Sequence, residues 1–261
     1  MAAVDDFTAG AYRFIPGGFQ FSGGVAAMQG YDIKRFRFRS PVPLADGFAR
    51  IEKTIMGAGR PLTAFCACEL RSPGQFTEQG FRAFNEAYVV TLQKWGVFDG
   101  KVNPVARSNV CPEFEPPEEP SFHAFSFTVP TAATAPSFVI SGRAEAREGD
   151  ASYRERIVRF GETSAEAMNE KARYVMDEVA ARLALFGVGW RDVTATWRKR
   201  SSAAKRVIRG VIQPSGRLAT SEMPHPAAAS TMRAATGLSA SISRFPGRSL
   251  PAGLVPPRIA Q

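Results

Sequence analysis

Alternating apolar and polar positions predict strands and helices along the first 197 residues of the chain. In residues 34–39 aromatic and cationic side chains alternate, which indicates a strand with one apolar and one cationic face. We also expect a strand at 19–24. Four apolar residues then recur at helical spacing and predict a helix that ends at Gly57 and Gly59. These four are Leu44, Phe48, Ile51 and Ile55.

The patterned region continues to residue 129. It predicts strands at 62–70, 106–111 and 121–129. Between the first two of these strands, five apolar residues share one face of a helix that stops at Gly96. They are Phe81, Phe84, Tyr88, Leu92 and Trp95.

A shorter series of elements after residue 136 looks like a copy of the first. Residues 138–142 echo 19–23, and 156–160 echo the strand of alternating cations and aromatics. A capping box at 163–166 predicts the start of a helix. Its apolar face carries Met168, Ala172, Val175, Val179, Leu183 and Phe186. An offset of 128 residues places Phe48, Ile51, Ile55, Gly59 and Phe65 on Met176, Val179, Leu183, Gly187 and Val193.

This correspondence indicates an internal repeat. The alternative is that any amphipathic helix followed by a glycine and a strand would align equally well. On the repeat hypothesis the chain has four parts. They are a complete unit (1–130), a linker (131–136), a partial second unit (137–197) and a basic, low-order tail (198–261).

Charge separates the tail from the rest of the chain. The protein has 33 Lys and Arg, 24 Asp and Glu and a net charge of +9, but 11 of the basic residues and only one acid, Glu222, lie in 198–261. Residues 1–197 are therefore almost neutral. We expect about 210–261 to be disordered. The tail is either a genuine basic extension or the product of a reading-frame error. Its single aromatic residue, Phe245, argues against nucleic-acid binding.

Composition excludes several classes of protein. No apolar run is long enough for a membrane-spanning helix, and the first ten residues do not resemble a signal peptide, so we expect a cytoplasmic protein without membrane contact. Cys66 and Cys68 lie in an apolar strand and are expected to be buried, reduced thiols, and packing is also the expected role of Cys111. With two histidines in the chain, a multi-histidine metal site is not expected, and neither is any other cofactor.

The sequence holds no strong catalytic motif of the nucleophile-elbow, zinc-protease, phosphate-loop or dinucleotide-binding type. The informative segment is 103–110, in which Arg107 follows a proline turn and enters a strand. The planar guanidinium of an arginine in this position can bind a carboxylate through two parallel hydrogen bonds. The alternative is an ordinary arginine on a surface strand.

Four short motifs in order over residues 10–129 resemble the YjgF/RidA (reactive intermediate deaminase) family. They are Gly10-Ala-Tyr12, Phe21-Ser22-Gly23, Phe84-Asn85-Glu86-Ala87-Tyr88 and Pro104-Val-Ala-Arg107-Ser-Asn-Val110. The resemblance implies an α+β, chorismate-mutase-like fold, here in tandem with an incomplete second copy. It also implies a homotrimer with clefts between subunits and hydrolytic deamination of enamines and imines of 2-keto acids.

The resemblance also implies roles for individual residues. Arg107 corresponds to the family's substrate-carboxylate arginine and Tyr12 to its N-terminal site tyrosine. Ser22 and Gly23 correspond to the strand end that lines the cleft, and Asn85 to the family's helix asparagine.

One family residue is missing from this chain. The family's closing strand commonly carries a glutamate that orients water, but residues 121–127 contain no acid. His123 is the nearest titratable residue, and its ordinary pKa suits proton transfer near neutrality. A structural histidine is the alternative for His123, and Glu118 or Glu119 is the alternative for the missing acid.

The cations suggest the substrate. A dicarboxylate needs a second cation besides Arg107, and Arg37, within the ladder of Arg35, Arg37 and Arg39, is our candidate. In its tandem layout the chain resembles the 2-aminomuconate deaminases of nitroaromatic and aminophenol breakdown. We therefore expect deamination of 2-aminomuconate or a substituted 2-aminomuconate. The alternatives are a general 2-iminoacid deaminase and a non-catalytic module that binds small carboxylates.

Overall fold

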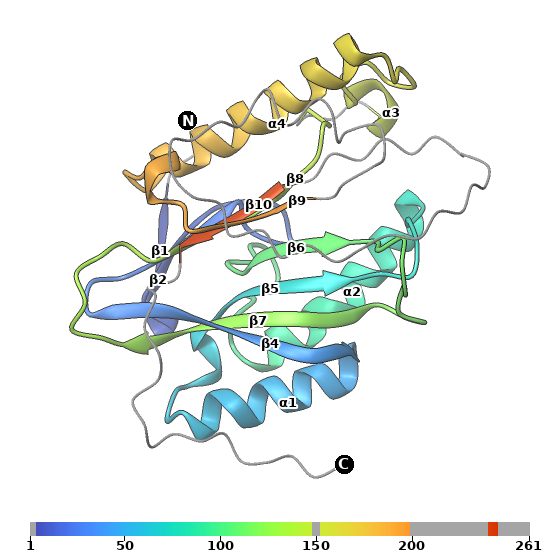
Figure 1. Cartoon of the computed structure of the whole chain (residues 1–261). Helices are drawn as coiled ribbons and strands as arrows, with labels where there is room; N and C mark the ends of the chain where they lie inside the picture. The colour runs from blue at the N-terminus through green and yellow to red at the C-terminus, as the bar shows by residue number, and fades with distance from the viewer. Residues whose placement is uncertain (1–3, 148–151, 199–239, 245–261) are drawn as a thin grey trace.

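A computed structural model describes residues 4–147, 152–198 and 240–244 (Figure 1). These residues form a mixed α+β structure with two sheets. The six-stranded sheet has the order β1 (Asp5–Phe7), β2 (Tyr12–Ile15), β3 (Gly24–Ala27), β8 (Phe138–Arg143), β10 (Ala240–Arg244) and β9 (Ala195–Arg198). The four-stranded sheet has the order β4 (Tyr31–Pro43), β7 (Ser121–Pro130), β5 (Phe65–Arg71) and β6 (Ala106–Val110).

Each sheet is covered by helices (Figure 1). Helices α1 (Leu44–Gly57) and α2 (Glu78–Lys94) pack together on one face of the four-stranded sheet, where Phe48 of α1 contacts the rings of Tyr88 and Trp95. Helix α4 (Ala165–Leu185) packs on the six-stranded sheet through Val179 and Leu183. The short elements are the helix α3 (Tyr153–Arg156) and the 3-10 turns η1 (Thr8–Gly10), η2 (Leu62–Ala64) and η3 (Trp190–Asp192).

The predicted helix over residues 44–57 is confirmed. Phe48, Ile51 and Ile55 are buried, as their spacing indicates, and burying each such side chain contributes about 1.5–3 kcal/mol. After the helix, Gly59 has a φ of +68°, a conformation that costs glycine little, and the Arg60 N–H then donates to the Ile55 carbonyl.

The strand with alternating cations and aromatics is also confirmed and is longer than predicted. It forms β4, which pairs with β7. On its apolar face Phe36 stacks on Phe125 and Phe127, with ring centroids 5.5 and 5.2 Å apart. The arginines of β4 therefore point to the opposite face of the sheet.

Two predicted strands are wrong. Residues 19–23 form turns and isolated bridges instead of a strand, because Ser22 bridges Ala106 of β6, and β3 begins only at Gly24. Residues 156–160 also form no strand. Ser152 and Glu155 make a capping box that starts α3, and Arg159 then occupies a turn at a φ of +49°.

Other predictions need smaller corrections. Residues 62–64 form η2, so β5 starts three residues later than expected. At the start of α4 the capping residue is Ser164, whose hydroxyl accepts the Ala167 N–H. Strands β1 and β2, which include Tyr12, were not predicted.

The segment around α4 shares several features with the segment around α1. Both helices are followed by a glycine at positive φ, Gly59 (+68°) and Gly187 (+70°), at the predicted offset of 128. The turns η2 and η3 also begin 128 residues apart, and each leads into a strand. Met176 is only partly buried, whereas Phe48 is buried.

Most of the predicted low-order tail lies outside the described residues, since 199–239 and 245–261 are not among them. Of the tail, Arg198 ends β9, and residues 240–244 form β10, which pairs with β8 and β9. The expectation of disorder is therefore wrong for 240–244, because these residues pair with two strands. In the described ranges no helix is long and apolar enough to cross a membrane. Within the same ranges no three His, Cys, Asp or Glu residues come together as ligands for a metal ion.

Candidate functional site

Arg107 lies near the start of β6, the edge strand of the four-stranded sheet. The parallel register pairs Arg107 with Cys68 of β5, so both side chains point to the face covered by α2. The Arg107 side chain is buried, and the residue is only 3% exposed. The alternative of an ordinary surface arginine is therefore wrong.

Four aromatic rings surround the Arg107 guanidinium. Its central carbon lies 4.8 Å from the ring centroid of Phe21, 4.9 Å from Tyr88, 5.6 Å from Phe84 and 5.9 Å from Phe81. We call these four rings the cage. The cage stabilises the cation through the ring faces and excludes water from it.

One hydrogen bond fixes the guanidinium inside the cage. Arg107 Nη2 donates to Asn85 Oδ1 at 2.6 Å, and Asn85 Nδ2 donates in turn to the Phe81 carbonyl at 2.6 Å. In the described part of the chain, the buried Arg107 Nη1 has no hydrogen-bond partner. Burying a polar group without a partner costs about 1–3 kcal/mol, and more for a charged group. An anionic acceptor at Nη1 would offset that cost.

The polar groups under the cage are neutral. Cys68 Sγ lies 3.3 Å from the Tyr88 hydroxyl, and burial raises the pKa of the Cys68 thiol to about 12. Burial likewise raises the pKa of Tyr88 well above its usual value and lowers that of Arg107. Cys66 and Cys68 are buried thiols as predicted, and neither has the lowered pKa of a nucleophile.

Ser22 and Gly23 lie beside the start of β6. The Ser22 N–H donates to the Val105 carbonyl at 2.9 Å, and a Cβ at Gly23 would approach Ile15 Cγ2 to 2.9 Å. From β8, Ser141 accepts the backbone N–H of Arg107 at 3.0 Å. The structure therefore brings Arg107, Asn85, Ser22 and Gly23 into one region, and the roles expected for them stay predictions.

Tyr12 is placed in the core. Its hydroxyl donates to the Phe65 carbonyl at 3.2 Å, its ring packs on Phe7, and burial raises its pKa. It is not one of the four rings of the cage. Its role as a site tyrosine stays a prediction.

His123 belongs to the opposite face of the four-stranded sheet. Arg35 forms a two-bond ion pair with Glu69 at 2.5 and 2.9 Å, and Glu69 follows Cys68 on β5, so its side chain points away from α2. Burial and the charges of Arg71, Arg35 and Arg37 lower the pKa of His123 to about 4, against the opposing effect of Glu69. We call this side, with Arg35, Arg37, Glu69, Arg71 and His123, the charged face.

The other candidates near β7 are exposed. Arg37 lies on the charged face with its side chain in solvent, and Glu118 and Glu119 lie in the exposed turn before β7. Within one chain, His123 and Arg37 therefore lie across the sheet from Arg107.

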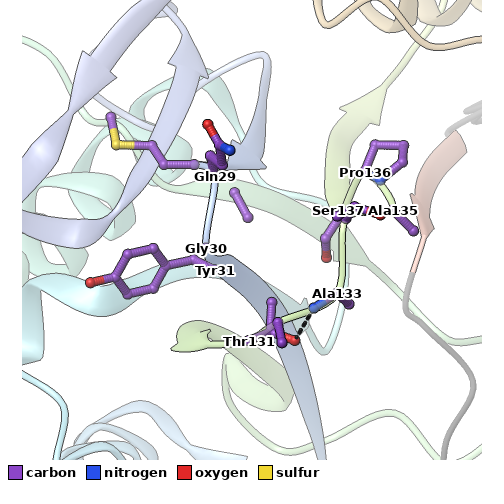
Figure 2. A pocket seen from close by; sticks show the side chains of 12 residues that line it. Gln29, Gly30, Tyr31, Thr131, Ala133, Ala135, Pro136 and Ser137 are labelled. Carbon is purple, nitrogen blue, oxygen red and sulfur yellow. Dashed lines mark hydrogen bonds between the residues drawn. The ribbon is translucent and has the colours of Figure 1, made fainter.

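A separate pocket lies between the turn at 27–31 and residues 131–137 (Figure 2). Thr131 Oγ1 accepts the Ala133 N–H at 3.1 Å within it. None of the twelve side chains that line the pocket is charged. It offers no cation to an anionic ligand, so the cage is the better candidate site.

Two parts of the site were not predicted. Three cage residues, at positions 81, 84 and 88, lie about one turn apart on α2, and Asn85 lies on the same side of the helix. From the sequence, this spacing predicts only a buried helix face. Ser141 was seen only as an echo of Ser22. The sequence signal for the cage is an asparagine within a stripe of aromatic residues. For Ser141, no local sequence feature marks a role in the site.

Comparison with known proteins gives a consistent result. Residues 4–219 match the model of a family described as 2-aminomuconate deaminase CnbZ. A 2-amino-5-chloromuconate deaminase of Comamonas testosteroni is 50% identical over 192 residues, which cover 73% of this chain and 76% of that protein. No solved structure matches the chain.

Proposed function

The chain belongs to the 2-aminomuconate deaminase family CnbZ, and on that basis we propose that it deaminates 2-aminomuconate or a substituted 2-aminomuconate in the breakdown of aromatic compounds. The reaction is hydrolytic. The enamine takes a proton at C3 to give the 2-imine, water adds to C2, and the C2–N bond of the resulting carbinolamine breaks. Ammonia leaves with the nitrogen, and the water oxygen remains as the 2-oxo group.

The observation that carries this proposal is the unpaired Nη1 of Arg107. The carboxylate at C1 binds Nη1 within the cage, while Asn85 occupies Nη2 and keeps the guanidinium plane fixed. Since C2 is bonded to C1, clamping the carboxylate also fixes the carbon that water attacks. Ser22 and Gly23 lie beside the start of β6, where the Ser22 N–H donates to the Val105 carbonyl.

The proposal includes the RidA-type fold and its tandem arrangement. The tandem arrangement is supported by the offset of 128 residues between Gly59 and Gly187, which also separates η2 from η3. The chorismate-mutase-like topology is supported by the order of the four motifs along the first 130 residues.

We propose further that the site is completed between subunits of a homotrimer. Arg107 and His123 lie on opposite faces of one sheet, so one chain cannot bring both to the same substrate. In the trimer the charged face of a second subunit meets the cage. The neutral imidazole of His123 then moves the proton or orients the water, and Arg37 binds the distal carboxylate.

The activity is tested by ammonia release from freshly generated 2-aminomuconate and 2-amino-5-chloromuconate, with 2-iminopropionate as the monocarboxylate comparison. We expect faster turnover of the dicarboxylates. Equal turnover of 2-iminopropionate would indicate a general 2-iminoacid deaminase. Binding of cis,cis-muconate without ammonia release from either substrate would indicate a carboxylate-binding module.

The shared site is tested by mixing two inactive variants, Arg107→Ala and His123→Gln, after unfolding and refolding them together. In a randomly mixed trimer, about a quarter of the sites combine an intact Arg107 with an intact His123 from the next subunit. We expect that fraction of wild-type activity to return. No recovery in a mixture shown to contain hybrid trimers would overturn the intersubunit site.

A further inference from the structure

Ser141 of β8 makes three hydrogen bonds at the base of the cage. Its Oγ accepts the Arg107 N–H at 3.0 Å and donates to the Ser22 carbonyl at 2.6 Å, and its own N–H donates to the Gly23 carbonyl at 3.1 Å. The residue is fully buried. One side chain therefore ties the backbone of Arg107 to the Ser22–Gly23 segment.

The position of β6 explains why this contact matters. β6 is an edge strand of its sheet and pairs on one side with β5, so its outer N–H and C=O groups have no neighbouring strand in that sheet. Ser22 bridges this outer edge at Ala106, and the Ser141 hydroxyl takes the next N–H, that of Arg107. Without the Ser141 hydroxyl, the buried backbone N–H of Arg107 would lose this acceptor. Arg107 is the residue that carries the caged guanidinium.

The origin of Ser141 is also informative. The segment 138–142 echoes 19–23, so Ser141 and Gly142 correspond to Ser22 and Gly23. In the structure the two Ser-Gly pairs touch each other at the base of a single cage. The second half of the chain thus contributes a residue to the site of the first half.

We propose that Ser141 is a positioning residue for the carboxylate-binding Arg107. It acts through the backbone of β6 and touches no substrate. This inference rests on the proposed function, in which Arg107 clamps the substrate carboxylate. It predicts that loss of the Ser141 hydroxyl shifts the guanidinium inside the cage. Carboxylate binding should then weaken equally in the ground state and in the transition state.

The test compares Ser141→Ala with Ser141→Thr, which keeps the hydroxyl, and with Ser137→Ala as a matched control. Ser137 is also a buried serine beside β8, and its Oγ also accepts a backbone N–H at 3.0 Å, from Ile33. The measurements are KM and kcat for 2-aminomuconate, the Kd of the unreactive cis,cis-muconate and the melting temperature.

For Ser141→Ala we expect KM and the Kd of muconate to rise about tenfold, with kcat within about threefold of wild type. Ser141→Thr should restore both constants. Ser137→Ala should lower the melting temperature to a similar extent and leave KM and Kd unchanged. If Ser141→Ala fails to fold, Ser141→Cys, which fills the space of the hydroxyl with a thiol that is only a weak acceptor, replaces it in the same comparison.

Failure of this inference differs from failure of the proposed function. If the wild type releases no ammonia but binds muconate, the deaminase proposal fails, while the Kd series still tests Ser141. If the wild type is active and Ser141→Ala matches Ser137→Ala in KM and Kd, the positioning role is overturned.

Discussion

Arginines lie on both faces of the four-stranded sheet, and their charges are satisfied in different ways. On the α2 side, Arg107 is buried among four rings with one hydrogen bond to a neutral amide and an unpaired Nη1. On the charged face, the partly buried Arg35 forms two bonds to the Glu69 carboxylate. Neighbouring positions of β5, Cys68 and Glu69, therefore face two opposite environments.

The difference separates an arginine that is paired with a carboxylate from one that has a buried N–H group without a partner in the described residues. A paired arginine already has its carboxylate, and a ligand would have to displace it. An unpaired Nη1 in a water-excluding cage bears a desolvation cost that a carboxylate can offset. Arg107 therefore carries a desolvation cost at Nη1 that Arg35, with its carboxylate partner, does not carry.

The largest expected effect comes from removing the caged cation. Arg107→Ala should lower kcat/KM for 2-aminomuconate at least about a hundredfold, since a charge-assisted pair at a desolvated site is lost. Arg107→Lys should recover little, because a single ammonium cannot hold Asn85 and the carboxylate at the two separate positions that Nη2 and Nη1 provide. Arg35→Lys serves as the control on the charged face and should fall less than about fivefold. Equal losses for Arg107→Lys and Arg35→Lys would contradict the distinction between the two arginines.

The second prediction makes the caged arginine resemble the paired one. Asn85→Asp places a carboxylate at the position that now contacts Arg107 Nη2 at 2.6 Å. The variant should bind cis,cis-muconate about tenfold or more weakly, because the cation is neutralised from within. Its melting temperature should change little, because the new ion pair is offset by the loss of the bond that Asn85 Nδ2 donates to the Phe81 carbonyl. Calorimetric titration and thermal denaturation measure the two effects. An unchanged Kd would show that Nη1 does not bind the anion.

The third prediction makes the paired arginine resemble the caged one. Glu69→Gln removes the anion of the Arg35 pair, whose side chains are only 19% and 14% exposed. We expect the free energy of unfolding to fall by about 1–3 kcal/mol in urea denaturation. The loss should be small in Arg35→Met/Glu69→Leu, in which both charges are replaced by apolar groups. A double variant as unstable as Glu69→Gln would mean that the ion pair itself stabilises the fold and that the loss in Glu69→Gln does not come from leaving Arg35 unpaired.

The sequence predicted the helices better than the site. The spacing of Phe48, Ile51 and Ile55 determined α1, because burial of one helical face dominates its stability. Residues 19–23 failed as a strand, because Ser22 pairs with distant Ala106 and no local pattern encodes that contact. For the candidate site, motifs pointed to Arg107 and Asn85, which the structure brings into contact, and their roles stay predictions.

The unpredicted parts of the site depend on contacts between residues distant in sequence. The cage joins Phe21 to α2, and Ser141 reaches Arg107 across 34 residues. The opposite facing of Arg107 and His123 depends on strand register, since a shift of one residue would reverse it. Register follows from the assembled sheet, so the motifs alone could not give it.

The smallest predicted effect concerns stability and pH on the charged face. The pKa of His123 is about 4 in the folded chain, lowered mainly by burial and then by Arg71, whereas a histidine in an unfolded chain has a pKa near 6.5. Between these values the unfolded state binds a proton that the folded state does not. Stability should therefore fall as the pH drops from about 6.5 towards 4, by at most about 1.4 kcal/mol per pH unit, and this group adds no slope above 6.5.

Because carboxylates titrate in the same range, the measurement is the difference between wild type and His123→Gln in urea denaturation at several pH values. Relative to His123→Gln, the wild type should lose stability steadily below pH 6.5, since glutamine cannot be protonated. A difference that stays constant from pH 7 to 4.5 would show that His123 keeps an ordinary pKa, and the charged face would then be as open to solvent as the exposed Arg37.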